Sequence, residues 1–353
     1  MEHRQVKHTL GFHACSALVA RMSLKVTILV ASALILVGQS GGEEAKAFRD
    51  EDLELERQLK LLNKPPTQDG STVDCIDINK QLAFDHPLLQ NHTIQMEPSS
   101  LPKGMKPASD LPIEPVKFET VQCPHGTVPV RRTRKKDLIA AKTLSTSYGA
   151  PSNEGGYHFS TVKTFRDRPT NFYGARSFIE IWKPNVSADQ FSSSEMQIQT
   201  VIPSLYSDDK PRLTSSWTAD GHQKTGCFNL LCPGFVQITR QYYMGMPFTR
   251  ISGYGGSIYY VNSLVFKDPA SGNWWFIVRN SEGVVNFGYW PGSLFNNLAD
   301  HATELEFGGQ VYSPPNQPSP QWAADISILK TLLKLLPYNT MFGGPGGPNC
   351  IEY

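Results

Sequence analysis

The sequence lacks the features that would direct its 353 residues to nucleic acid or into a lipid bilayer. Its 33 basic and 32 acidic side chains leave a formal net charge of +1, so there is no excess of positive charge for phosphate groups. The uncharged apolar run VTILVASALILV, at 26–37, is shorter than the roughly 20 residues that a membrane-spanning helix needs. We therefore expect no nucleic-acid partner and no membrane-spanning segment.

The common motifs of catalysis are also missing. The sequence contains no G-x-S-x-G, no H-E-x-x-H and no Walker loop. The glycines of GYGGS, at 253–257, lack the spacing of a phosphate-binding loop and predict a turn. Because the histidines are scattered along the chain, they do not indicate a metal site.

The uncharged run near the N-terminus predicts a secretory signal peptide rather than a buried helix. Arg21 and Lys25 precede the run, and the small residues GQS at 38–40 offer a cleavage site. Translation from Met22 would place this signal at the start of the protein. We therefore expect a secreted, extracellular protein that passes through an oxidising compartment, where disulfides persist.

Two cysteines lie five positions apart in TGCFNLLCPGF, residues 225–235. A zinc site needs four ligands in tetrahedral reach, and no second pair lies near Cys227 and Cys232. A closely spaced pair in a secreted chain is typical of a local disulfide, so we favour that bond over a metal site or a redox centre. Asn91 and Asn185 begin Asn-x-Ser/Thr sequons and are candidate glycosylation sites.

The first half of the chain predicts little regular structure apart from one helix. DEDLELERQLKLL at 50–62 is polar and helix-prone, whereas the Pro- and Ser-rich stretch 97–117 predicts loop. The basic block RRTRKK, at 131–136, predicts an exposed linker that is open to proteolysis. The stretch 137–156 is rich in Ala, Ser and Gly and indicates a domain boundary.

The second half predicts an all-β fold. SFIEIW at 177–182 and GFVQITRQYY at 234–243 alternate apolar and polar residues, as half-buried strands do. KDPASG at 267–272 lies between two further strand-like runs and predicts a hairpin turn. Many short strands separated by turns favour an antiparallel sandwich. Two helices are also predicted, at 291–305 and 325–337.

Several long stretches make the sequence resemble the plant neprosin family. TVDCIDINKQLAFDHPLLQNHTIQMEPSS (72–100) and CPHGTVPVRR (123–132) resemble the family's propeptide. YGARSFIEIWKPNV, PRLTSSWTADGHQKTGCFNLLCPGFVQ, DPASGNWWF and GYWPGSLFNNLADHATELEFGGQV are similar to its catalytic domain. The resemblance extends over about 72–313, with one internal gap.

The resemblance implies a fold, an activity and a site. Neprosins are secreted glutamic endopeptidases that cut beside proline, and they are made as zymogens with an inhibitory propeptide. They have an antiparallel β-sandwich with two glutamates facing across a cleft, and they use no metal or organic cofactor. One such carboxyl stays protonated and acts as the acid, while the other acts as the base. The family pairing also implies a disulfide between Cys75 and Cys123.

The chain departs from the family pattern at both glutamates. The first belongs to an I-E-A-G-W-like strand that would lie between Gln199 and Thr200, where the two flanks are joined directly. At the second, the motif W-G-G-E reads FGGQ, so Gln310 occupies the catalytic position. Glu306 matches a non-catalytic family position, but a regular strand would place it on the same face as Gln310, so it is the candidate substitute unless the two glycines between them form a bulge. Glu195 matches the preceding family strand and not the catalytic pair. The family's segments beyond residue 313 are also missing, which leaves Cys350 without its family partner.

These observations predict an all-β protein, with an antiparallel β-sandwich domain of catalytic type preceded by a small propeptide region. The predicted divisions are a signal region at 1–40, a propeptide at 41–132, a linker at 133–156, a sandwich at 157–321 with a deletion near 199–200, and a divergent tail at 322–353. The expected partners are the chain's own propeptide and, if active, proline-rich peptides or proteins.

We expect catalysis to be impaired. The alternatives are a non-catalytic β-sandwich that binds peptides or glycans, and a mis-joined gene model of an active peptidase. Trp217, Tyr289 and Trp290 are the candidates for lining a substrate cleft or a sugar platform, with core packing as their alternative.

Overall fold

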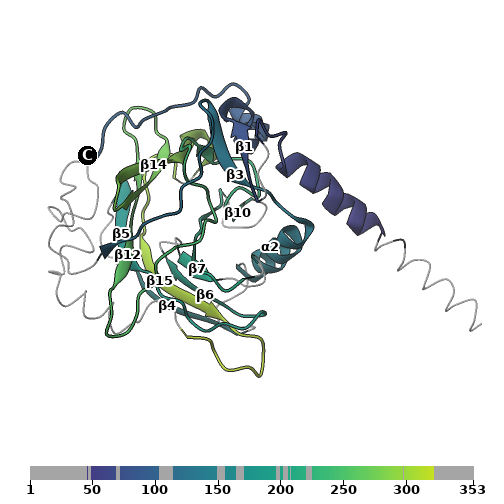
Figure 1. Ribbon diagram of the computed structural model, residues 1–353. Coiled ribbons are helices and arrows are strands. Elements are labelled where there is room, and N and C mark those ends of the chain that lie inside the picture. The colour runs from purple at the N-terminus through teal and green to yellow at the C-terminus, as the bar shows by residue number, and fades with distance from the viewer. Residues whose placement is uncertain are drawn as a thin grey trace, which may run out of the picture. The chain divides into compact units, whose positions relative to one another are not determined.

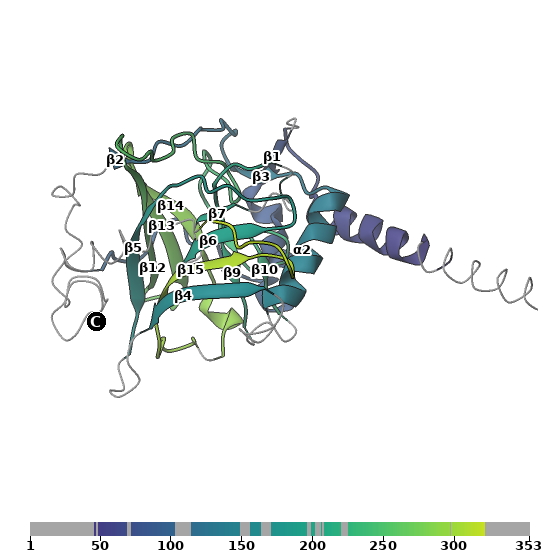
Figure 2. The ribbon, with the colours of Figure 1, turned by 90° about the horizontal axis from the view of Figure 1, so that it is seen from below.

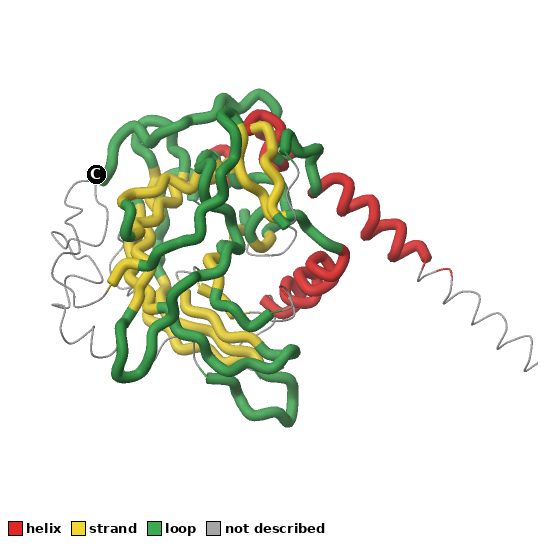
Figure 3. The backbone as a smooth tube through the Cα atoms, in the orientation of Figure 1, coloured by secondary structure: helices red, strands yellow, loops and turns green. Residues whose placement is uncertain are grey.

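The computed structural model consists mainly of strands and loops, with few helices (Figure 3). It describes residues 46, 49–68, 72–102, 114–148, 156–163, 171–195, 199–201, 206, 208–219, 225–296 and 298–321. No helix in these ranges is long and apolar enough to cross a bilayer. The chain divides into two compact units, Met1–Gln58 and Leu59–Tyr353. Residues 49–62 are helical, as predicted for 50–62, and all that follows concerns the second unit.

The elements of this unit are as follows. The strands are β1 (Val73–Asp77), β2 (Glu114–Pro115), β3 (Thr127–Arg131), β4 (Tyr157–Lys163), β5 (Gly174–Glu180), β6 (Phe191–Glu195), β7 (Gln199–Val201), β8 (Arg212–Leu213), β9 (Ser216–Trp217), β10 (Cys227–Phe228), β11 (Val236–Gln237), β12 (Tyr259–Lys267), β13 (Trp274–Asn280), β14 (Gly283–Trp290) and β15 (Glu306–Tyr312). The helices are α2 (Lys135–Tyr148) and the 3₁₀ turns η1 (Ile78–Lys80), η2 (Leu82–Asp85), η3 (Pro87–Leu89) and η4 (Gly292–Leu294).

The larger sheet has six strands in the order β11-β14-β13-β12-β2, with β5 also paired to β12. All of its pairs are antiparallel except β2 with β12. β12 and β13 form the hairpin that KDPASG predicts, so this prediction is confirmed. Where β14 passes β11, Gly288 has a φ of +155°, and a Cβ there would lie 2.1 Å from the Val236 carbonyl oxygen. Only glycine therefore permits this pairing.

The second sheet has five strands in the order β4-β15-β6-β7-β8, so β15 is paired on both sides. Figure 1 shows its strands below the larger sheet, and Figure 2 shows the same arrangement turned by 90°. β7 contains the junction between Gln199 and Thr200, and it pairs with β6 and β8 on its two sides. The ladder therefore continues across the position where the family resemblance implies a lost strand.

Apolar side chains from opposite faces of the larger sheet form two cores. On one face, residues of β12, β13 and β14 such as Val261, Phe276 and Phe287 join the largest buried cluster. On the other face, Phe266, Trp275 and Tyr289 pack beneath Ala83, Phe84 and Ile94. The segment before α2 thus completes a core of the sheet, because without it these aromatic rings would face water.

Two secondary-structure predictions are wrong. Of the helix predicted at 291–305, the described residues form only the turn η4. Trp274 donates to the Leu298 carbonyl, and Phe172 and Ala302 form a β-bridge. The loop buries Leu294, Phe295 and Ala302 in the core, so these apolar residues leave water without forming a helix. Residues 135–148 of the predicted linker form α2. The helix predicted at 325–337 lies outside the described residues, as does Cys350.

Candidate functional site

Gln310 lies in the middle of β15, where the register places it opposite Phe159 of β4 and Ser193 of β6. Residues directly opposite one another in antiparallel strands share a face of the sheet. Gln310 is 1% exposed, and the Ser193 hydroxyl donates to its backbone carbonyl over 3.2 Å. The second family position is therefore a buried one within a regular strand.

The amide of Gln310 is buried without hydrogen bonds. Among the described residues, neither its Nε2 nor its Oε1 has a partner, and the hydroxyls of Ser192 and Ser194 on β6 are in the same condition. A buried polar atom without a partner costs about 1–3 kcal/mol. An amide can donate and accept hydrogen bonds, but it cannot take up or release a proton as a carboxyl group does.

The two nearby glutamates differ in their backbone positions. β15 keeps an uninterrupted register through Gly308 and Gly309, so Glu306 lies four regular strand residues from Gln310, on the same face. That spacing amounts to about 13 Å along a strand, too far for two carboxyl groups to share a proton. Glu195 pairs with Gly308 and is thus the diagonal neighbour of Gln310, at roughly 7–8 Å between backbones. The register favours Glu195 over Glu306 as the nearer residue.

Helix α2 lies beside the five-stranded sheet (Figures 1 and 2). Tyr312, two residues further along β15 on the same face, has its ring centroid 4.6 Å from that of Tyr157. Both belong to an aromatic cluster against which Ala140 and Ala141 of α2 pack. The helix that follows the basic block therefore lies over the sheet where the family resemblance places a cleft.

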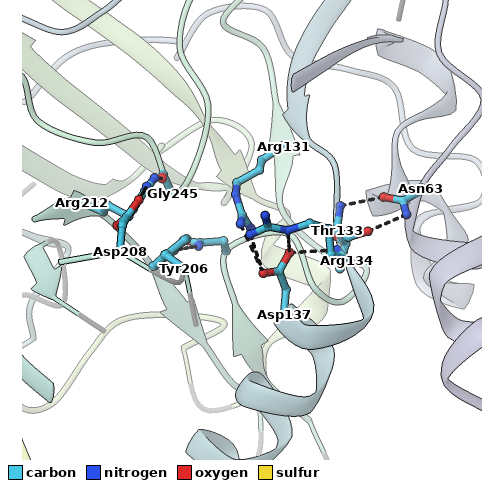
Figure 4. Close-up of polar contacts among 10 residues, drawn as sticks. Asn63, Arg131, Thr133, Arg134, Asp137, Tyr206, Asp208, Arg212 and Gly245 are labelled. Carbon is cyan, nitrogen blue, oxygen red and sulfur yellow. Dashed lines mark hydrogen bonds and ion pairs between the residues drawn. The ribbon is translucent and has the colours of Figure 1, made fainter. Parts of the chain in front are cut away.

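The basic block is held by carboxylates and is not the exposed linker that the sequence predicts. Asp137, which is fully buried, accepts from the Arg134 backbone over 2.8 Å and from Nη2 of Arg131 over 3.3 Å (Figure 4). Arg132 forms a two-pronged ion pair with Asp74, at 2.8 and 2.5 Å. Burial raises the pKa of Asp137, but the hydrogen bonds and charges of the two arginines outweigh it and hold the pKa below its usual value.

Tyr206 connects the basic block to the second sheet. The guanidinium carbon of Arg131 lies 5.0 Å from the centre of its ring, and that of Arg212 lies 4.4 Å away (Figure 4). Arg212 also donates to Asp208 over 2.6 Å and to the Gly245 carbonyl over 2.7 Å. Burial raises the pKa of Tyr206. The neutral ring can therefore hold both cations by cation–π attraction.

A separate set of contacts holds the segment before α2 to the larger sheet. Asp268, in the β12–β13 turn, accepts from Gln95 Nε2 over 2.7 Å, from the Ser99 backbone over 3.3 Å, from the Ser99 hydroxyl, and from Ser271. Burial raises the pKa of Asp268, yet these donors outweigh it and lower the pKa overall. On β11, Gln237 donates to the Pro129 carbonyl over 2.7 Å, and its Oε1 accepts from none of the residues that the structure describes.

The three aromatic residues singled out from the sequence belong to the interior. Trp217, Tyr289 and Trp290 are at most 8% exposed. Trp217 packs edge-on against Phe295, and the Tyr289 hydroxyl accepts from the Gln95 backbone over 2.9 Å. None of them presents an open ring face to a sugar, so the core-packing alternative describes them.

The cysteine pairs are bonded as expected. Cys227 is joined to Cys232, and Cys75 to Cys123. Asn91 and Asn185 are exposed. Within the described ranges, no group of three His, Cys, Asp or Glu side chains is placed to hold a metal ion.

The residues that sequence reasoning missed are Asp137, Tyr206, Arg212 and Asp268. Only Asp137 leaves a sequence signal, because an acidic residue three positions after Arg134 fits the first turn of a helix. Apart from the local pairs of Arg212 with Asp208 and of Asp268 with Ser271, the partners of the other three come from distant parts of the chain, so no local pattern reveals those contacts.

Comparison with protein families gives two adjoining matches. Residues 176–324 match the family described as neprosin. Residues 65–170 match the family described as neprosin activation peptide. The second match includes the basic block, α2 and also β4, a strand of the five-stranded sheet.

Proposed function

This chain belongs to the neprosin family, with an activation peptide preceding the neprosin domain, and on that basis we propose that it is a secreted, zymogen-like homologue with an impaired catalytic site. By family, its ancestral activity is the cleavage of peptides beside proline. By sequence, its activation peptide still precedes the neprosin domain. What it has lost is the pair of carboxyl groups.

The observation that carries this proposal is Gln310. A glutamic endopeptidase needs one ionised carboxylate to activate water and one protonated carboxyl to supply a proton to the leaving amine. Gln310 cannot fill either role, because its amide does not titrate near neutral or acid pH. Its burial without partners supports a position inherited from a carboxyl group and not rebuilt for another task.

The junction at Gln199 supports the same proposal. β7 passes through this point with only three residues, and it is paired on both sides. This continuous pairing supports the loss of the family strand that would carry the first glutamate at this junction. On this proposal, the chain has lost one glutamate by deletion and the other by substitution.

Other features support an extracellular location. Two disulfides and the signal-like N-terminus support passage through the secretory pathway, and the two exposed sequons would then be available for glycosylation. The expected ligand of any remaining cleft is a peptide rather than a glycan, since the three aromatic residues proposed for a sugar platform are buried.

An activity measurement tests the proposal. We expect the secreted chain, both whole and with residues 1–156 removed, to leave proline-containing peptides uncut at acid pH, at the level of a no-enzyme control. Loss of a catalytic group typically costs several orders of magnitude in rate. Turnover that persists in Glu306→Gln and Glu195→Gln would show that the site lies elsewhere, and turnover abolished by one of them would identify a substitute carboxyl.

A further inference from the structure

The larger sheet has a basic cavity that plays no part in the proposed function. It has a volume of about 260 Å³ and lies on the sheet face covered by the activation peptide. The residues that line it are Leu101, Pro102, Arg176, Asn262, Leu264, Ile277, Arg279 and Val284. Among the described residues that line it, two arginines and one asparagine amide are the polar groups, and none is acidic.

The strand register brings the three polar residues together. Asn262 of β12 pairs directly with Arg279 of β13. Arg176 of β5 pairs with Leu264, so Arg176 is the diagonal neighbour of Asn262 on the other side. The Arg176 Nε donates to the Asn262 Oδ1 over 2.9 Å. The two guanidinium groups therefore flank one amide on the same face.

The electrostatics of this cluster call for a negative charge. Burial and the neighbouring charge of Arg279 lower the pKa of Arg176. In the described part of the chain, the Arg279 guanidinium has no hydrogen bond or ion pair. Like charges held together in a partly buried site destabilise each other unless an anion lies between them.

Asn262 supplies the second, independent observation. It is only 3% exposed, and its Nδ2 has no hydrogen-bond partner among the described residues. Its Oδ1 is already occupied by Arg176, so the amide group is oriented with its N–H donors available. A buried donor without an acceptor is costly, which indicates a ligand oxygen at this point.

We propose that this cavity binds an oxyanion group, a carboxylate or a phosphate, between Arg176, Asn262 and Arg279. Guanidinium groups recognise such groups through paired, charge-assisted hydrogen bonds. Leu264 and Ile277 offer an apolar floor for the body of an organic acid. Leu101 and Pro102 form one wall, so the ligand would bind the form in which the activation peptide is in place and stabilise it.

Thermal unfolding of the full chain tests the proposal. Inorganic phosphate and succinate are titrated at constant ionic strength, with sodium chloride as the control. We expect one of the two anions to raise the Tm saturably by several degrees, on the order of 2–8 °C, whereas chloride does not. A response to phosphate alone would assign the phosphate class, and a response to succinate alone would assign the carboxylate class. A Tm unaffected by both overturns the proposal.

Two variants make the test specific. Arg279→Gln should weaken anion binding at least about tenfold, because it removes a charged hydrogen-bond donor, while Arg279→Lys should retain part of the response. Asn262→Asp places a carboxylate between the guanidinium groups, so it should raise the Tm without added anion and abolish the response to added anion. An undiminished response in Arg279→Gln contradicts the assignment, even if Asn262→Asp does not fold.

Discussion

Arg131 of the activation peptide lies over the ring of Tyr206 in the neprosin domain, with 5.0 Å between the guanidinium carbon and the ring centre. Arg212 lies over the same ring, and Asp137 pairs with Arg131 from the start of α2. One tyrosine therefore connects the basic block, the helix and the five-stranded sheet. The arrangement makes the basic block an anchor of the activation peptide.

We expect Tyr206→Leu to weaken this anchor. Loss of two partly desolvated cation–π contacts should lower the free energy of unfolding by about 1–3 kcal/mol, measured by urea denaturation. The ring, and not the hydroxyl, should matter most, so Tyr206→Phe should cost less although it loses the hydrogen bond from Asn229. Trypsin should also cut Tyr206→Leu faster at Arg131. Equal stability of the leucine variant and the unmodified chain would rule out the anchor.

Asp268 should make the attachment of the activation peptide sensitive to acid. Its pKa in the folded protein is below its usual value, so its stabilising effect is complete above the unfolded pKa of about 3.9 and is lost as pH falls through the folded value. We therefore expect the Tm to fall below about pH 4, and to fall less steeply in Asp268→Asn. Parallel Tm profiles of the two proteins between pH 2 and 6 would contradict this.

Gln310→Leu should stabilise the protein. The substitution replaces two buried amide atoms, which have no partner among the described residues, with a side chain of similar size, so the free energy of unfolding should rise by about 1–3 kcal/mol. Gln237→Leu is the matched control, because Gln237 is equally buried but its Nε2 donates to Pro129. That variant should lose stability. If both variants lose stability in chemical denaturation, the Gln310 amide forms hydrogen bonds in the folded protein, and the prediction is wrong.

Repair of the catalytic face should need both carboxyls. We expect a chain with a family-type strand ending in I-E-A-G-W between Gln199 and Thr200, and a family-type C-terminus after Val311, to stay weakly active. Adding Gln310→Glu should raise the cleavage rate at acid pH by on the order of 10² or more, because it restores an acid–base group. The gain should fade as pH rises through the upper apparent pKa of the pair. Equal activity with and without Gln310→Glu would show that the second catalytic carboxyl is not at position 310.

The parts of the fold that sequence revealed were those fixed by local patterns. The β12–β13 hairpin follows from a turn between two strand-like runs, and the bond between Cys227 and Cys232 follows from their spacing. The predicted helix at 291–305 failed for the opposite reason. The segment is a loop that contacts β13, and the spacing of its apolar residues alone does not distinguish a buried loop from a helix.

The candidate site was only partly predictable for a related reason. The motif FGGQ located Gln310, but its burial and its missing partners depend on β4, β6 and α2. The basic block suggested exposure because charges usually face water. Asp74 and Asp137 override that tendency by ion pairing, and the fold, not the local sequence, brings Asp74 to Arg132.

The position of β15 in the chain determines when the five-stranded sheet can form during synthesis. β15 pairs with β4 on one side and with β6 on the other, and the ribosome delivers both long before it delivers β15. Until then, each of the two has an edge of unpaired backbone groups, which is open to pairing with other chains. Chains released before residue 306 should therefore aggregate through β4 and β6, and chaperones would have to protect these two strands during synthesis.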